Sequence, residues 1–221
     1  MTVATLNLQE IIADIKLEQP TVLYGVSWED YIEYAETMLD KSNYKMSYNR
    51  GVLKIMGNAL KHENLSRFLD RLVTLVGLFL RKNIVPAGSM TLVSNKLRKG
   101  ADPDESYYIQ NAHLANIKDK LFDDATDTPP DLVVEIDRSH SSDDKFEIYA
   151  AFGIKEFWLY SREVLRIFRL TETGEYLEAE KSEALPILTA QALTDFINRA
   201  QNEEQFKVLS DFQNWLEENK Q

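Results

Sequence analysis

The segment from Pro129 to Trp158, PPDLVVEIDRSHSSDDKFEIYAAFGIKEFW, constrains the fold more than any other part of the 221-residue chain. Leu132 to Val134 form a short apolar run typical of a buried strand. After a polar loop, the pattern predicts a helix from Asp143 to Phe152, and Gly153 is suited to its end. Glu156 to Tyr160 is a second strand candidate. Strand, helix and strand in this order imply a parallel pair joined by a right-handed crossover.

The sequence on both sides of this unit predicts further strands and helices. A capping box at Ser27 opens a helix that runs to about Leu39. Asn49-Arg50-Gly51 is a hairpin turn between two short strands. A long helix is predicted over 59–82, because apolar residues recur there every three or four positions. The remaining strand candidates are 44–48, 52–56, 90–97, 106–110, 164–170 and 175–180, and the remaining helix candidates are 188–200 and 203–218.

These elements indicate an α/β or α+β fold, with a mixed β-sheet flanked by helices. The parallel pair provides the α/β part, and the hairpins on either side add antiparallel neighbours. We expect an N-terminal extension over 1–25 and a core domain over 26–185. The helices of 186–221 are expected to pack on that core or to lie at an oligomer interface.

Composition excludes several classes of protein. The chain has no cysteine, so disulfides and cysteine-ligated metals are ruled out. No apolar run approaches the roughly 18 residues needed to span a bilayer. The first 20 residues lack a basic region followed by an apolar one, so a secretory signal is not expected. We therefore expect a cytoplasmic protein that does not enter membranes.

Charge is unevenly distributed along the chain. The net charge is −11, yet residues 41–100 carry twelve Lys or Arg and two acids. Residues 172–221 carry eleven acids and four bases. The basic segment is able to contact phosphate groups, but it can equally be a solvated helix surface.

Two acids at strand ends and one lysine form the candidate site. Glu135 ends the buried run, where an unpaired carboxylate is costly. Asp104 follows Pro103 at the start of another strand candidate. Lys145 lies near the start of the following helix and can reach back to Glu135. Together they resemble the residue set of a metal-dependent phosphodiesterase.

Each of these residues also has a purely structural interpretation. Glu135 can form a structural salt bridge with Lys145 or Arg138, and Asp104 can be a turn residue after proline. Lys145 can be a helix-surface lysine paired with Asp144 or Glu147. The histidines and the serines of the loop before residue 143 lack metal-ligand or nucleophile spacing and are interpreted as ordinary polar residues.

The residues that carry these signals also carry a family resemblance. PPDLVVEID, YAAFGIKEFWLY and LRIFRL, with Pro103-Asp104 upstream, resemble the Uma2 family, or DUF820. That family is abundant in cyanobacteria and belongs to the PD-(D/E)XK restriction-endonuclease-like superfamily. The resemblance is dense over about 100–170 and fades towards both ends. It implies a restriction-endonuclease-like fold, with DNA as substrate.

The resemblance also implies a metal site. Asp104 and Glu135 match the acids that hold a divalent ion in the superfamily, usually Mg²⁺ with Mn²⁺ as a possible substitute, and the third ligand would be the carbonyl of Ile136. The superfamily lysine normally lies two residues after the second acid, where this chain has Asp137. Lys145 is then the matching lysine. Glu63 matches an acid that some members add, although a helical wheel turns it away from the core.

Three functions remain open from the sequence. The first is a magnesium-dependent endonuclease with Asp104, Glu135 and Lys145 at one site. The second is an inactive protein that kept the nuclease fold for binding or assembly. The third is an oligomeric interaction protein whose acidic C-terminal helices form a homodimer through Phe212 and Trp215. The first and third are compatible, since nucleases of this type often cut as homodimers.

Overall fold

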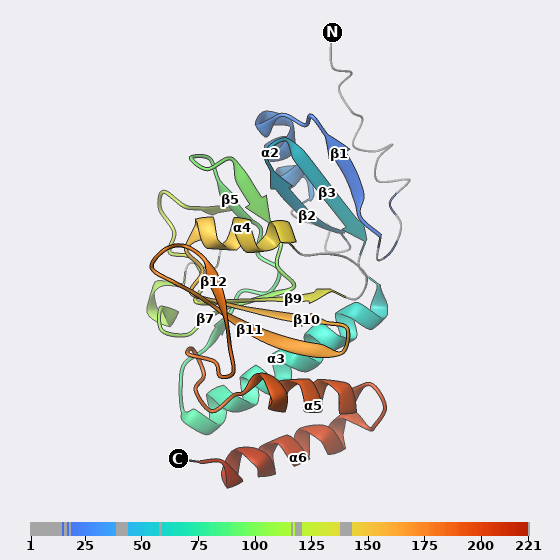
Figure 1. Cartoon of the computed structure of the whole chain (residues 1–221), viewed down its shortest axis with the longest axis vertical. Coiled ribbons are helices and arrows are strands. Elements are labelled where there is room, and N and C mark those ends of the chain that lie inside the picture. The colour runs from blue at the N-terminus through green and yellow to red at the C-terminus, as the bar shows by residue number, and fades with distance from the viewer. Residues whose placement is uncertain are drawn as a thin grey trace.

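Two six-stranded sheets are stacked with a helix between them (Figure 1). The structure is a computed structural model, and it describes residues 15, 17, 19–38, 44–57, 59–115, 117, 121–137 and 143–220. Most of the expected N-terminal extension and the candidate pairing residue Arg138 lie outside these residues. Within them, no helix is long and apolar enough to cross a bilayer.

The first sheet has the strand order β1-β3-β2-β6-β5-β8. It is antiparallel except for the pairing of β5 with β8, and helix α2 packs on it through Trp28 and Tyr31. The turn between β2 and β3 contains Arg50 at a φ of 51° and Gly51 at 80°, as the predicted hairpin requires. The elements are β1 (Thr21–Tyr24), α2 (Trp28–Met38), β2 (Tyr44–Asn49), β3 (Val52–Gly57), β5 (Leu92–Ser94), β6 (Lys99–Ala101) and β8 (Phe122–Asp123).

The second sheet has the strand order β12-β11-β10-β9-β7-β4. It contains the predicted parallel pair, because β9 and β10 are parallel and helix α4 connects them. The sequence pattern thus predicted the mixed topology, while the structure divides the strands between two sheets. The elements are β4 (Val85–Pro86), β7 (Glu105–Tyr108), β9 (Leu132–Asp137), α4 (Asp143–Phe152), β10 (Glu156–Ser161), β11 (Val164–Leu170) and β12 (Tyr176–Ala179).

Each face of the second sheet buries its own apolar layer. Along β9, Val133 faces α4, whereas Leu132, Val134 and Ile136 belong to the core that contains α3. Successive side chains of a strand point to opposite faces, so Glu135 shares the α4 face with Val133. The layer around α4 also contains Leu92 and other residues of the first sheet, so this helix is packed between the two sheets.

Helices α3 and α5 cover the other face of the second sheet, and α6 packs against these two helices (Figure 1). Phe212 of α6 is fully buried and packs edge-on against Phe196 of α5, with ring centroids 4.9 Å apart. A substitution at Phe212 would therefore disturb the core of this chain, whether or not α6 also contacts a second chain. The elements are α3 (Leu60–Leu80), α5 (Ala190–Ala200), α6 (Gln205–Glu218) and a 3₁₀ turn at Ala112–Leu114.

Candidate active site

The candidate site lies where the chain passes from the first sheet to the second. Asp102, Pro103 and Asp104 connect β6 to β7. Asp102 is held by the first sheet, because its amide donates to the carbonyl of Met46 at 2.9 Å and its Oδ2 accepts from the Met46 amide at 2.7 Å. Asp104 is held by the second sheet, where its amide donates to the carbonyl of Val134 at 3.0 Å. The change of sheet therefore takes three residues.

Strand register brings the two predicted acids together. Glu105 of β7 pairs with Val134 of the antiparallel strand β9. The next position on each strand is Asp104 on one side and Glu135 on the other, so both acids stand at the same point of the sheet. The Oδ2 of Asp104 also accepts from the amide of Ile136 at 2.5 Å. Both acids are nearly buried, with 5% and 7% of their surfaces exposed.

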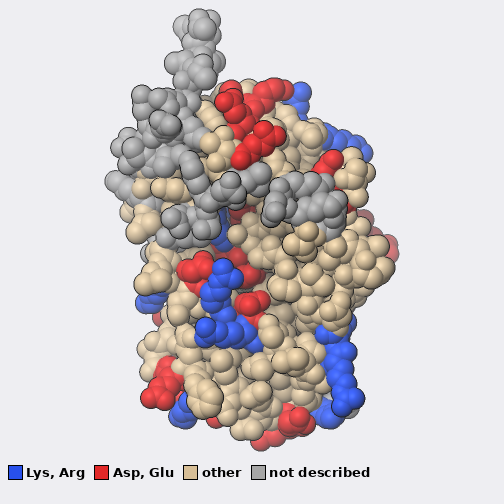
Figure 2. All heavy atoms as spheres, turned by 180° about the vertical axis from the view of Figure 1, so that it is seen from behind, with Lys and Arg blue, Asp and Glu red and all other residues tan. Residues whose placement is uncertain are grey.

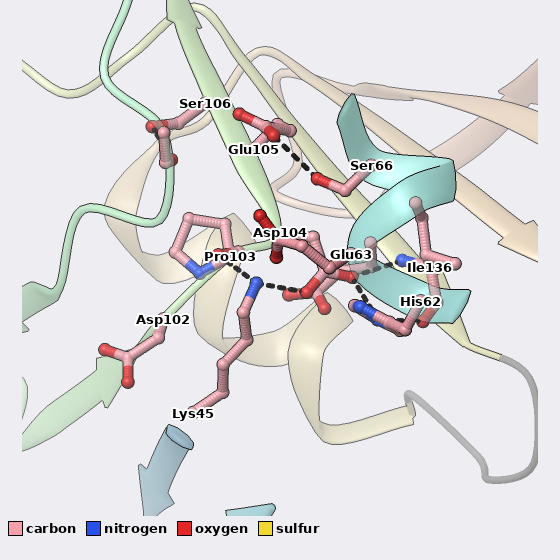
Figure 3. Close-up of polar contacts among 12 residues, drawn as sticks. Lys45, His62, Glu63, Ser66, Asp102, Pro103, Asp104, Glu105, Ser106 and Ile136 are labelled. Carbon is pink, nitrogen blue, oxygen red and sulfur yellow. Dashed lines mark hydrogen bonds and ion pairs between the residues drawn. The ribbon is translucent and has the colours of Figure 1, made fainter. Parts of the chain in front are cut away.

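Asp104 is bound by a lysine and a histidine from other elements (Figure 3). Lys45 of β2 places its Nζ on Asp104 Oδ1 and on the carbonyl of Pro103, the latter at 3.0 Å. His62, in the first turn of α3, places its Nε2 at 3.1 Å from Asp104 Oδ2 and at 2.8 Å from the carbonyl oxygen of Ile136. Both oxygens of the Asp104 carboxylate therefore have partners.

Glu135 is bound from α4. Lys145 donates from its Nζ to Glu135 Oε1 at 2.9 Å and to the carbonyl of Asp102 at 3.2 Å. The hydroxyl of Tyr149 donates to the same Oε1. Lys145 and Tyr149 are four residues apart on one helix, and this spacing places them on the same face. The structure thus brings Asp104, Glu135 and Lys145 together at one point.

Burial and neighbouring charges shift the pKa values of the two acids in opposite directions. Burial alone would raise the pKa of Asp104, but Lys45 and His62 hold it well below the usual range. Burial raises the pKa of Glu135, and the negative charge of Asp104 adds to this, although Lys145 opposes it. Paired acids whose pKa values are pushed apart are a common property of catalytic sites.

Glu63, Asp144 and Glu147 form ion pairs with residues other than Lys145. Glu63 pairs with Arg67 one turn along α3 at 2.8 Å, and 42% of its side chain is exposed. Asp144 pairs with Lys54 at 2.8 Å. Glu147 pairs with Arg50 at 2.8 Å and with Lys99 at 2.7 Å. Lys145 therefore points to Glu135 while the acids beside it face the first sheet.

Sequence reasoning missed three residues of this cluster. His62 has no metal-ligand spacing in the sequence, but in the structure it is 4% exposed and contacts both Asp104 and Ile136. Lys45 carried no signal, because a lysine in a short strand is usually solvent-facing. Tyr149 had a usable signal, since it lies one helical turn after Lys145.

The donor set of the cluster fits a hard divalent cation. Two carboxylates and the carbonyl of Ile136 offer oxygen ligands, which Mg²⁺ prefers, and Mg²⁺ commonly takes only one or two carboxylates and keeps several waters. Among the described residues, no group of three or more His, Asp or Glu side chains is placed to hold a metal ion. Main-chain and water ligands would therefore have to complete the coordination.

The surface on the opposite side from the view of Figure 1 carries mixed charge. Near the middle of this face, Lys and Arg side chains lie directly beside Asp and Glu side chains (Figure 2). Arg50 and Lys99 of the basic segment pair with Glu147, an acid from outside that segment. The basic excess that the sequence shows over residues 41–100 is thus partly neutralised in space.

The adjacent strands β7 and β9, with an acid beside or on each, and the parallel strand β10 reached through α4 fit the restriction-endonuclease-like fold that the sequence resemblance implies. Comparison with protein families agrees with this class. The chain belongs to the Uma2 family, described as "putative restriction endonuclease", whose model matches residues 28–219.

A solved structure has the same fold. It is the crystal structure of "a putative nuclease belonging to DUF820 from Anabaena variabilis ATCC 29413", which superposes with a TM-score of 0.51 at 14% identity. The match covers 78% of this chain and 99% of that one. No curated protein matches the sequence.

Proposed function

We propose that this chain is a metal-dependent endonuclease that hydrolyses phosphodiester bonds of DNA. Membership of a family described as restriction endonucleases supports a nucleic-acid substrate. The observation that carries the proposal is the register of β7 and β9, which brings the carboxylates of Asp104 and Glu135 to one point beside Lys145. In this proposal Asp104, Glu135 and the carbonyl of Ile136 hold Mg²⁺ or Mn²⁺.

The protein side chains have distinct tasks in this proposal. When bound, the ion supplies positive charge for the developing phosphoryl anion and lowers the pKa of a water ligand. Lys145 and Tyr149 orient the Glu135 carboxylate through their contacts with Oε1. The Lys145 ammonium is also available to donate to a phosphoryl oxygen. His62 holds the Ile136 carbonyl and the Asp104 carboxylate in fixed relative positions.

A second function, a nuclease fold retained without activity, is favoured by one specific observation. Asp104 and Glu135 already have a lysine partner each, Lys45 and Lys145. A buried carboxylate that is paired with a lysine needs no metal ion to balance its charge. This alternative predicts neither metal-dependent cleavage nor metal binding at these acids.

The substitution Glu135→Gln separates the two functions. We expect it to lower the rate of plasmid nicking in Mg²⁺ or Mn²⁺ by about 10²–10³-fold, a size known for the loss of one preorganised polar group in an active site. We expect it also to weaken Mn²⁺ binding in isothermal titration. The matched control is Glu178→Gln on β12, an exposed glutamate away from the site, which should leave both properties unchanged.

The same experiment identifies the inactive alternative. Wild-type protein that neither nicks plasmid nor binds Mn²⁺ would rule out the proposed nuclease. Nicking that survives Glu135→Gln undiminished would place the chemistry elsewhere or assign it to a contaminant.

A further inference from the structure

Lys45 is a buried lysine that belongs to no part of the expected nuclease residue set. It lies on β2 of the first sheet, and 8% of its surface is exposed. Lysines are almost never buried to this degree unless they are paired. Its partners are Asp104 Oδ1 and the carbonyl of Pro103, both on the segment that joins the two sheets.

The position of Lys45 is fixed by its strand. On one side of β2, Ser47 pairs with Ala101 of β6, and on the other Met46 pairs with Ile55 of β3. The Met46 main chain also exchanges two hydrogen bonds with Asp102. Lys45 itself pairs with Met56 of β3, so the sheet holds its main chain while its ammonium contacts Pro103 and Asp104.

Lys45 and a divalent ion would compete for the same oxygen. Asp104 Oδ2 is already bound by the Ile136 amide and approached by His62, so Oδ1 is the oxygen that Lys45 alone occupies among the described residues. A dication placed on Oδ1 would lie within a few ångströms of the Lys45 ammonium. Like charges so close in a poorly hydrated site repel strongly.

The charge of the cluster also indicates that Lys45 and a divalent ion cannot both bind Asp104. Lys45 and Lys145 neutralise the carboxylates of Asp104 and Glu135 one for one. A dication added beside these two lysines would bring two further positive charges to the same two buried carboxylates, which is costly.

We infer that Lys45 is a built-in cation that occupies the metal position on Asp104, so that a divalent ion binds only as Lys45 leaves. Lys45 is thus a positioning residue that sets the metal affinity of this chain. The inference rests on the proposed function, since it assigns the same two acids to the metal. It differs from that proposal in predicting that removal of a native residue strengthens metal binding.

The test is isothermal titration of Mn²⁺ into the wild type and three lysine variants. Lys45→Met and Lys45→Gln should bind Mn²⁺ at least tenfold more tightly than the wild type. Lys45→Arg keeps the charge and should bind as weakly as the wild type. The matched control is Lys54→Met, which removes a lysine of the neighbouring strand β3 that pairs with Asp144 at 2.8 Å and should leave the affinity unchanged.

Folding is checked on the same samples by circular dichroism and urea denaturation. Lys45→Gln guards against an unfolded Lys45→Met, because the glutamine amide is a hydrogen-bond donor and the methionine side chain is not. The shift in melting temperature caused by Mn²⁺ gives a second readout, and it should be larger for Lys45→Gln than for the wild type. Adding Glu135→Gln to either variant should abolish the gained affinity.

The possible results are distinct. Equal Mn²⁺ affinity in the wild type, Lys45→Met and Lys45→Gln would overturn the inference and leave the proposed nuclease in place. Gained affinity that persists after Glu135→Gln would also overturn it, because the ion would then be bound elsewhere. Failure of every variant to bind Mn²⁺ would overturn the inference and the proposed function together.

Discussion

Replacing Asp104 by alanine is expected to lower the free energy of unfolding by about 3–5 kcal/mol, the usual loss when one partner of a buried ion pair is removed. Lys45 would remain buried without its counter-charge, and His62 and the Ile136 amide would both lose their carboxylate partner. Urea denaturation followed by circular dichroism measures the effect.

The control for this prediction is Asp144→Ala. Asp144 of α4 also pairs with a lysine of the first sheet, but its partner Lys54 is one-third exposed. Partly exposed pairs contribute about 0–1 kcal/mol, so this variant should stay close to the wild type. Similar losses in the two variants would mean that the Asp104 cluster is not the buried network described above.

The low pKa of Asp104 adds a pH dependence with a defined sign. Its carboxyl is ionised more readily in the folded than in the unfolded chain, since Lys45 and His62 outweigh the effect of burial. The resulting stabilisation is fully present above the pKa of an unfolded aspartate, about 3.9, and is lost as the pH falls towards the lower folded value. Asp104→Asn should therefore flatten the loss of stability with acid.

Replacing Glu156 by alanine is expected to cost at least about 3 kcal/mol of unfolding free energy, since buried donors left without an acceptor cost about 1–3 kcal/mol each. Glu156 begins β10 and is 2% exposed. Its carboxylate accepts hydrogen bonds from Trp158 Nε1 and Ser182 Oγ, each at 2.6 Å, and from the amides of Glu183 at 2.6 Å and Ala184 at 3.1 Å.

Substitution of Glu156 should lower the stability of the fold without lowering its affinity for Mn²⁺. The residue fastens the segment before α5 to the second sheet and makes no contact with the Asp104 cluster among its hydrogen bonds described above. Folded Glu156→Ala protein should therefore bind Mn²⁺ as the wild type does, whereas Glu135→Gln should not. A loss of Mn²⁺ affinity in folded Glu156→Ala protein would contradict this division.

The contrast between Glu135 and Glu156 shows where sequence reasoning ends. Both are acids in apolar strand patterns, on neighbouring strands of one sheet. The local pattern predicted the strands, the crossover helix and the reach of Lys145, because these depend on residues at most about one element apart. The partners of Glu135 lie near it in the sequence, Lys145 only 10 residues away, whereas Ser182 lies 26 residues from Glu156. The partner of the other site acid is more distant still, since Lys45 lies 59 residues from Asp104.

The division into two sheets escaped prediction for a related reason. The pattern around Pro103 identified a strand start but not a change of sheet, which depends on the pairing of Asp102 with Met46. That pairing spans 56 residues. His62 was missed because its burial depends on how α3 is set against β9, not on its own neighbours in the chain.

Because the chain crosses between the sheets at this cluster, the contacts within the cluster depend on the position of one sheet relative to the other. One sheet carries Lys45 and the other carries Glu135, while the helix between them carries Lys145. A slip of one residue along a strand is roughly 3.3 Å, enough to separate an ion pair. The substitution Phe152→Ala removes the ring contact between α4 and Phe122. We therefore expect it to shift α4 and weaken the ion pairs of the cluster, although it changes no polar atom.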